Sequence, residues 1–225
     1  MMMKSWSATL KVSNNSIIAF DLDDTLYKEV DFLKSAYLEI AQELDANKWN
    51  LLYIEMFSMY RSGNNVFEFL TKKYEINLDD LLLKYRNHFP NIEVSDGVLN
   101  LLKNIKKNKG KIAIITDGRS QTQRNKIDAL GLIEYIDTIL ISEEIGYQKP
   151  ALKVFDKLEG LYPNHEFTYI ADNLKKDFIS PNLLNWDSIH LLDNGLNIHV
   201  NQMNFMKKEN LPKKYVASLN QIEVV

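Results

Sequence analysis

The chain has 225 residues, enough for one large or two modest domains with a real hydrophobic core. With 27 Lys and Arg against 30 Asp and Glu, its net charge of -3 gives no electrostatic reason to expect nucleic acid or a membrane as a partner. The absence of cysteine excludes disulfides, thiolate metal sites and thiol nucleophiles. No signal peptide or membrane span is evident, so we expect a cytoplasmic protein, whose oligomeric state composition leaves open.

The first apolar run, at 17–20, has the composition of a buried parallel strand and leads directly into acidic residues. Asp21, Asp23 and Asp24 place three carboxylates within four positions. Two like charges about 4 Å apart cost about 4 kcal/mol at the effective dielectric of a protein site. A divalent cation held by oxygen ligands would offset that cost, although an acidic loop after a strand is the simpler reading of this segment alone.

The segment 28–94 contains no strand-like run and shows helical patterns instead. Spacing predicts helices at 30–44, 49–60, 66–74 and from 78 onward, the last with Asn77 as its N-cap. The helix at 49–60 is apolar almost all round, which predicts burial between neighbours. An insert of about 65 residues is too long for a loop, so we predict an all-helical second domain at 28–94 inside a core made of 1–27 and 95–225.

Four later apolar runs also end in polar or acidic residues. They are 111–115 before Thr116, Asp117 and Gly118; 138–141 before Ser142; 167–171 before Asp172; and 188–192 before Asp193. Helical stretches at 120–130, 151–158 and 174–184 separate them, a pattern typical of βαβ units and a parallel sheet covered on both faces. This predicts a Rossmann-like α/β core with Asp21, Thr116 and Asp172 at one rim, where such sheets bind ligands.

Taken together, these features resemble the haloacid dehalogenase superfamily of phosphohydrolases, with the helical insert as its first type of cap. Four motifs match in order: Asp21-Leu22-Asp23-Asp24-Thr25, Thr116 closing a strand, Lys149 before Pro150 and a helix, and the acidic pair Asp172 and Asp177. Ala171 stands where members usually carry glycine, a small residue in either case. Because dehalogenases of the superfamily lack the second aspartate of the first motif, Asp23 favours phosphate esters as substrates.

The resemblance implies a role for each reactive residue. Asp21 would be the nucleophile that forms an aspartyl-phosphate, and Asp23 the general acid, its pKa raised by a neighbouring carboxylate. Thr116 and Lys149 would stabilise the transferring phosphoryl group, and the phosphate-binding segment would also include Asp117 and Gly118.

The resemblance also implies a bound Mg²⁺. Its ligands would be Asp21, Asp172 and the backbone carbonyl of Asp23. Asp177 and Thr25 would not bind the ion themselves but would help to position the groups that do. The four histidines, at 88, 165, 190 and 199, lack the spacing of metal ligands and are expected at the surface or satisfied in the core.

The expected activity is Mg²⁺-dependent hydrolysis of a small soluble phosphate ester, either a sugar phosphate or a nucleotide. The segment 116–126 is similar to the corresponding stretch of N-acylneuraminate 9-phosphatases, which favours sugar phosphates. A phosphosugar mutase of the β-phosphoglucomutase type uses the same motifs and stays open as an alternative. A phospho-aspartate switch or a binding protein on the same scaffold are more remote alternatives.

Overall fold

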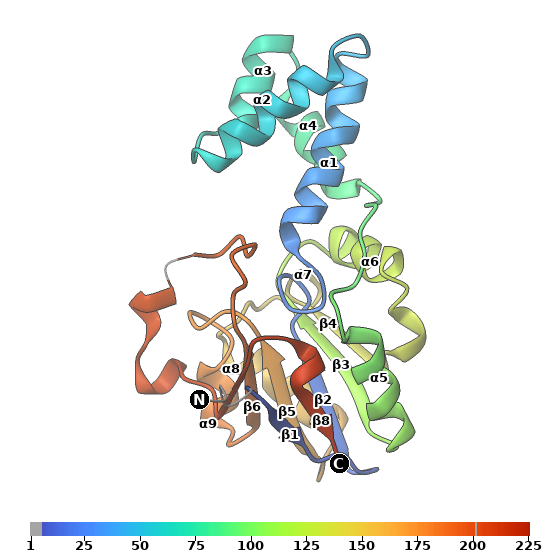
Figure 1. Cartoon of the computed structure of the whole chain (residues 1–225), viewed down its shortest axis with the longest axis vertical. Helices are drawn as coiled ribbons and strands as arrows, with labels where there is room; N and C mark the ends of the chain where they lie inside the picture. The colour runs from blue at the N-terminus through green and yellow to red at the C-terminus, as the bar shows by residue number, and fades with distance from the viewer. Residues whose placement is uncertain (1–5, 201) are drawn as a thin grey trace, which may run out of the picture.

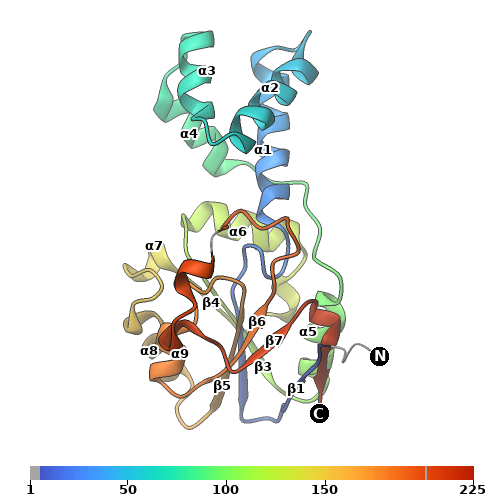
Figure 2. The ribbon, with the colours of Figure 1, turned by 60° about the vertical axis from the view of Figure 1, so that its left-hand side comes forward.

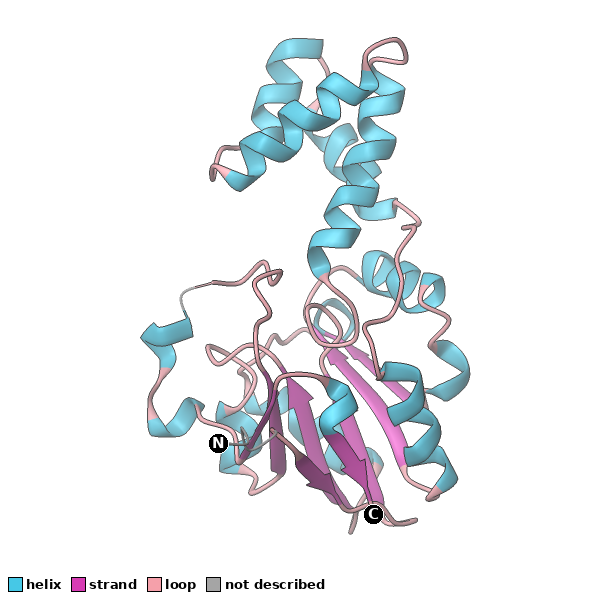
Figure 3. Ribbon diagram, in the orientation of Figure 1, coloured by secondary structure: helices cyan, strands magenta, loops and turns pink. Residues whose placement is uncertain are grey.

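A computed structural model describes residues 6–200 and 202–225 and confirms the predicted α/β core (Figures 1 and 3). Its main sheet has six parallel strands in the order β4-β3-β2-β5-β6-β7. These strands are β2 (Ser16–Phe20), β3 (Lys111–Thr116), β4 (Thr138–Ile141), β5 (Glu166–Ala171), β6 (Asp187–Leu191) and β7 (Lys214–Val216). Within the described residues, no helix combines the length and apolar character needed to cross a bilayer.

Helices cover both faces of this sheet. They are α5 (Val98–Lys107), α6 (Ser120–Ala129), α7 (Ser142–Ile145), α8 (Leu152–Leu161) and α9 (Ile179–Leu183). Alternate residues of each strand enter two separate cores: Ile18 and Phe20 of β2 pack on the side of α5, whereas Ile17 and Ala19 pack on the side of α8. This period of two, with every residue of β2 buried, explains why the strand is apolar throughout.

The strand order places the functional residues together. From β2 the chain proceeds to β3 and β4 on one side, and β5, β6 and β7 follow on the other. The carboxyl ends of β2 and β5 are therefore neighbours at the point where the order reverses, which is where open α/β sheets bind ligands. Asp21 follows β2 and Asp172 follows β5, and the Asp21 backbone N–H donates to the Ile170 carbonyl at 3.0 Å.

Four helices lie between β2 and α5 in the chain. They are α1 (Glu29–Leu44), α2 (Trp49–Arg61), α3 (Val66–Tyr74) and α4 (Leu78–Asn87). Figures 1 and 2 show them as a group beyond the carboxyl ends of the strands, joined to the sheet by α1 and by the segment that returns to α5. Their apolar residues form a cluster separate from the two cores beside the sheet, with Tyr37, Met56 and Leu70 among its buried members.

Three local predictions were wrong. Helix α2 buries Leu52 and Met56 but leaves Leu51 and Ile54 about 60% exposed, so it packs on one side only. The helix expected at 174–184 is confined to Ile179–Leu183, because side chains in the preceding turn bond to the backbone instead. The sequence also predicts a helix from Gly97 to Lys107 with Ser95 and Asp96 as its cap, but helix α5 begins after Gly97, which has a positive φ of 86° and no capping side chain.

Two short pairings were not predicted. β1 (Ala8–Leu10) and β8 (Ile222–Val224) form a separate parallel ladder between the two ends of the described chain, and β7 adds the last strand beside β6. Each of these three strands has only three residues, too few to establish an alternating pattern.

Candidate active site

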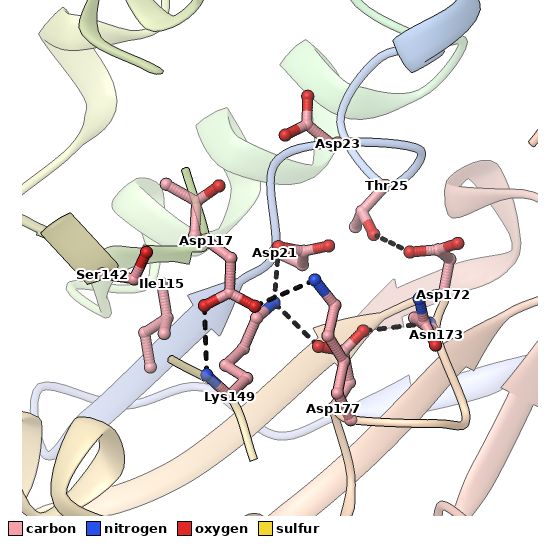
Figure 4. A network of polar contacts seen from close by, with 12 residues as sticks. Asp21, Asp23, Thr25, Ile115, Asp117, Ser142, Lys149, Asp172, Asn173 and Asp177 are labelled. Atoms are coloured by element: carbon pink, nitrogen blue, oxygen red, sulfur yellow. Dashed lines mark hydrogen bonds and ion pairs between the residues drawn. The ribbon is translucent and has the colours of Figure 1, made fainter. Parts of the chain in front are cut away.

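A buried lysine connects two of the predicted acidic residues (Figure 4). Lys149 Nζ lies 2.7 Å from Asp21 Oδ1 and 2.7 Å from Asp177 Oδ1, and it donates to the Tyr169 hydroxyl at 2.9 Å. The second oxygen of Asp177 accepts the Asn173 backbone N–H at 2.9 Å. The structure therefore brings Asp21, Lys149 and Asp177 together across three elements of the fold, as the sequence motifs predict.

Burial sets the ionisation of this group. It raises the pKa of Asp21 to about 7, although the positive charge of Lys149 opposes the rise. Burial alone would lower the pKa of Lys149, but the carboxylates of Asp177 and Asp21 outweigh it and hold that pKa well above its usual range. Lys149 is therefore a permanent cation beside the expected nucleophile.

Asp172 is the carboxylate that lacks a counter-charge. It is 2% exposed, and its side chain receives hydrogen bonds from two neutral groups, Asn197 Nδ2 at 2.8 Å and Thr25 Oγ1 at 3.5 Å. Among the described residues no lysine or arginine forms an ion pair with it. Burial and the nearby charge of Asp21 raise its pKa well above the usual range. An additional cation would relieve this arrangement.

The donor set fits a divalent metal ion. Single oxygens of Asp21, Asp172 and Asp177 lie within 4.8 Å of one another, and all three residues are buried. Carboxylate oxygens of this kind suit hard divalent cations. Asp177 already faces Lys149, which leaves Asp21 and Asp172 as the carboxylates best placed to hold a metal ion.

Asp23 lies in a different environment. Its carboxylate accepts from Lys126 Nζ at 2.7 Å, from Gln123 Nε2 at 2.8 Å and from the Tyr27 hydroxyl, and Figure 4 shows it directed away from Asp21. Burial alone would raise its pKa, but the Lys126 charge and these hydrogen bonds lower it below the usual value. The expectation that a neighbouring carboxylate would raise this pKa is therefore wrong for the structure, because a lysine 103 residues away reaches the same group.

The segment after β3 is ordered by side chains. Gln123 Nε2 donates to Thr116 Oγ1 at 2.5 Å, so the same amide contacts Thr116 and Asp23. Asp117 accepts from Lys176 Nζ at 2.9 Å and from the Lys149 backbone N–H at 3.0 Å. Gly118 has a φ of 145°, and a Cβ there would lie 3.1 Å from the Gln123 side chain, which favours glycine at this position.

These residues surround a small cavity of about 70 Å³. Its lining consists of Asp21, Asp23, Glu29, Thr116, Asp117, Asp172, Asn173, Lys176 and His199. Larger hollows lie elsewhere, including one of about 720 Å³ at the amino ends of β5 and β6, but they contain none of the motif residues. The motifs therefore converge on the small cavity at the carboxyl ends of the strands.

Sequence reasoning missed several residues of this site. Gln123 and Lys126 are spaced three apart on a predicted helix, a signal that they share one face. Glu29 and His199 carried no such signal. His199 belongs to the loop of residues 192–200, which meets the first motif where the Ile198 N–H donates to Asp24 Oδ2 at 2.8 Å.

The sheet order, the acidic cluster at its switch point and the buried lysine define the class: an α/β protein with a hydrolase-like site at the carboxyl ends of parallel strands. The chain belongs to the haloacid dehalogenase-like hydrolase family, which matches residues 18–189.

Individual relatives agree with this assignment. Glyceraldehyde 3-phosphate phosphatase of Methanocaldococcus jannaschii is 27% identical over 180 residues, 71% of this chain and 77% of that protein. The HAD-hydrolase YfnB of Bacillus subtilis is 30% identical over 132 residues, 56% of this chain and 55% of that protein. A YfnB crystal structure has a TM-score of 0.65 at 21% identity, covering 94% of this chain and 97% of that one, and therefore shares the fold.

Proposed function

We propose that this protein is a phosphatase that hydrolyses small phosphate monoesters through a phosphorylated Asp21. The observation that supports this most directly is the buried contact of 2.7 Å between Asp21 and Lys149, beside Asp172 at the sheet's switch point. Relatives with several names act on small phosphate esters, among them glyceraldehyde 3-phosphate and ribulose 1,5-bisphosphate. A phosphorylated small molecule is therefore the substrate class.

In the first step a carboxylate oxygen of Asp21 attacks phosphorus, and the bond between phosphorus and the alcohol oxygen breaks. The Lys149 cation and the Thr116 hydroxyl stabilise charge on the phosphoryl oxygens. Asp23 gives its proton to the departing alkoxide. Since Lys126 favours the carboxylate form of Asp23, that proton must be taken up before the step begins.

In the second step water attacks phosphorus of the aspartyl-phosphate and the bond to Asp21 breaks, which releases inorganic phosphate. Asp23, now a carboxylate, accepts the proton of the attacking water. The lowered pKa of Asp23 suits this half of the cycle, because Lys126 stabilises the charged base.

The metal in this proposal is Mg²⁺, which Asp21, Asp172 and the Asp23 carbonyl would hold; Asp177 would support the site through its ion pair with Lys149, and Thr25 through its hydrogen bond to Asp172. An all-oxygen donor set favours Mg²⁺ over softer metals, and the YfnB structure is described as bound to magnesium. When bound, the ion would supply positive charge that stabilises the phosphoryl oxygens and the Asp21 carboxylate.

We also propose that residues 28–94 act as a cap domain over a core made of 1–27 and 95–225. The separate apolar cluster of α1–α4 and their position beyond the strand ends support this division. Such a cap would limit access of water and large molecules to the site.

Phosphate release tests the proposal. Purified protein with Mg²⁺ should release inorganic phosphate from p-nitrophenyl phosphate and from a panel of sugar phosphates, nucleoside monophosphates and phosphoglycolate. For the best ester, phosphate formed should equal ester consumed. Conversion of a sugar phosphate to its isomer with little free phosphate would instead identify a mutase, and no consumption of any ester would contradict the proposal.

A further inference from the structure

The small cavity leaves little room beyond the phosphoryl group. Its volume of about 70 Å³ equals that of roughly two water molecules. Asp21 and Thr116 occupy the side where phosphorus would be attacked, so the leaving group must extend past the remaining lining residues. Two of these lie outside the family motifs and come from distant segments, Glu29 at the start of α1 and His199 in the 192–200 loop.

Glu29, which is half-buried, and His199, which is exposed, both line this cavity. Across residues 6–200 and 202–225, the Glu29 carboxylate and the His199 ring make no hydrogen bond or ion pair with another side chain. By contrast, the lysines nearest to them are already paired, Lys126 with Asp23 and Lys176 with Asp117. A ligand that donates and accepts hydrogen bonds could therefore bind to the Glu29 carboxylate and the His199 ring.

The charges around Glu29 define which ligand fits. Burial and the charges of Asp23 and Asp24 raise the pKa of Glu29 to about 8, against the opposing effect of Lys126 and Lys176. Burial and the charge of Lys176 lower the pKa of His199, so its ring is neutral near pH 7 and above. Above about pH 8 this side of the cavity therefore offers the Glu29 carboxylate and a neutral imidazole, and the Glu29 charge would repel a second anion there.

We propose that Glu29 and His199 select phosphate esters whose leaving group is uncharged and hydroxylated, and that Glu29 disfavours those with a carboxylate or a second phosphate near the ester. The inference rests on the proposed phosphatase function. It narrows the substrate class to monophosphates of polyols and simple sugars. Hydroxyl groups can donate to the Glu29 carboxylate and exchange hydrogen bonds with the His199 ring.

A matched substrate pair tests this selection. Glycerol 3-phosphate and 3-phosphoglycerate differ only in a hydroxymethyl group against a carboxylate. At pH 8.5, above the raised pKa of Glu29, the wild-type protein should prefer glycerol 3-phosphate by about tenfold or more in kcat/KM. Glu29→Gln should reduce that ratio to about threefold or less, mainly by improving 3-phosphoglycerate, whereas Glu29→Asp should keep a clear preference.

The exposed Glu134, in the 3-10 turn Ile133–Tyr135, provides the control, since Glu134→Gln should leave the ratio unchanged. If Glu29 only stabilised the start of α1, Glu29→Gln would lower Tm without changing the ratio, and the inference would be wrong. A wild-type protein that prefers 3-phosphoglycerate would also overturn it, even if the variants fail to fold. Hydrolysis of p-nitrophenyl phosphate but of neither three-carbon ester would contradict the substrate class. Failure on p-nitrophenyl phosphate as well would contradict the proposed function itself.

Discussion

Asp21 and Asp23 are two residues apart, yet they belong to regions with opposite charge balance. In the Asp21 region, Lys149 forms ion pairs with two of three buried carboxylates, Asp21 and Asp177, and Asp172 has no ion pair among the described residues. Around Asp23, one carboxylate is matched by one lysine and two further donors. The negative charge of the first region is not balanced without an added cation, whereas the charge of the Asp23 carboxylate is balanced by the folded protein itself.

The ionisation of the two residues follows from this difference. The pKa of Asp21 is raised to about 7, and that of Asp23 is lowered below its usual value. Burial favours the protonated form of both residues, so burial alone cannot distinguish them; the number of cations paired with each carboxylate does. We therefore expect the Asp21 region to respond to metal and the Asp23 region to respond to the leaving group.

The largest expected effect is on Asp21 itself. Asp21→Asn should reduce turnover of p-nitrophenyl phosphate by about four orders of magnitude, because an amide cannot form the phosphorylated intermediate. Steady-state kinetics on freshly purified protein would measure the loss, with mass spectrometry to exclude deamidation and circular dichroism to confirm folding. Turnover close to wild type would rule out Asp21 as the nucleophile.

Metal removal should have the next largest effect. EDTA should lower activity by about a thousandfold and Mg²⁺ should restore it, with Ca²⁺ a poor substitute because its coordination is larger and looser. Mg²⁺ should also raise Tm in the wild type but not in Asp172→Asn, since the variant lacks the carboxylate that has no counter-charge. Full activity in metal-free buffer, or an unchanged Mg²⁺ response in the variant, would contradict the proposed site.

Asp23→Asn should separate substrates by their leaving groups. Loss of the proton donor should slow the hydrolysis of glycerol 3-phosphate by about a hundredfold or more. It should slow the hydrolysis of p-nitrophenyl phosphate by only about tenfold, because nitrophenolate leaves without a proton. Lys149→Ala provides the comparison, since it should slow both esters by similar factors. Equal losses on both esters in Asp23→Asn would remove Asp23 from the role of general acid.

The smallest expected effect is a shift in pH dependence. Lys126→Met removes the charge that lowers the pKa of Asp23. Burial would then raise that pKa, so Asp23 would stay protonated to higher pH. In the pH profile of kcat/KM for glycerol 3-phosphate, the decline at alkaline pH should therefore shift to higher pH by about one unit. Lys106→Met, which breaks an ion pair with Asp137 on the surface, should leave this decline in place. A decline unmoved in Lys126→Met would contradict the assigned role of Lys126.

Local patterns predicted the frame of this site well. An apolar strand that ends in Asp21 and another that ends in Asp172 are readable from the sequence, because strand ends in a parallel sheet share one rim. The surroundings of Asp23 were not readable, since its ion pair joins residues 103 positions apart. The exposure of α2 was also missed, because an apolar composition does not specify how many neighbours a helix has.

The 192–200 loop has a consequence for how the site forms during synthesis. The Asp24 side chain accepts a hydrogen bond from the Ile198 N–H, 174 residues later in the chain, and the Asp172 side chain accepts one from Asn197 Nδ2. Contacts of such high sequence separation form late, since the chain between them must first be ordered. A ribosome-bound chain that ends before residue 190 should therefore lack phosphatase activity even with every motif residue translated, and an arrested-chain assay would measure this. Catalytic competence would then coincide with completion of the fold, so a partly made chain would not consume substrate.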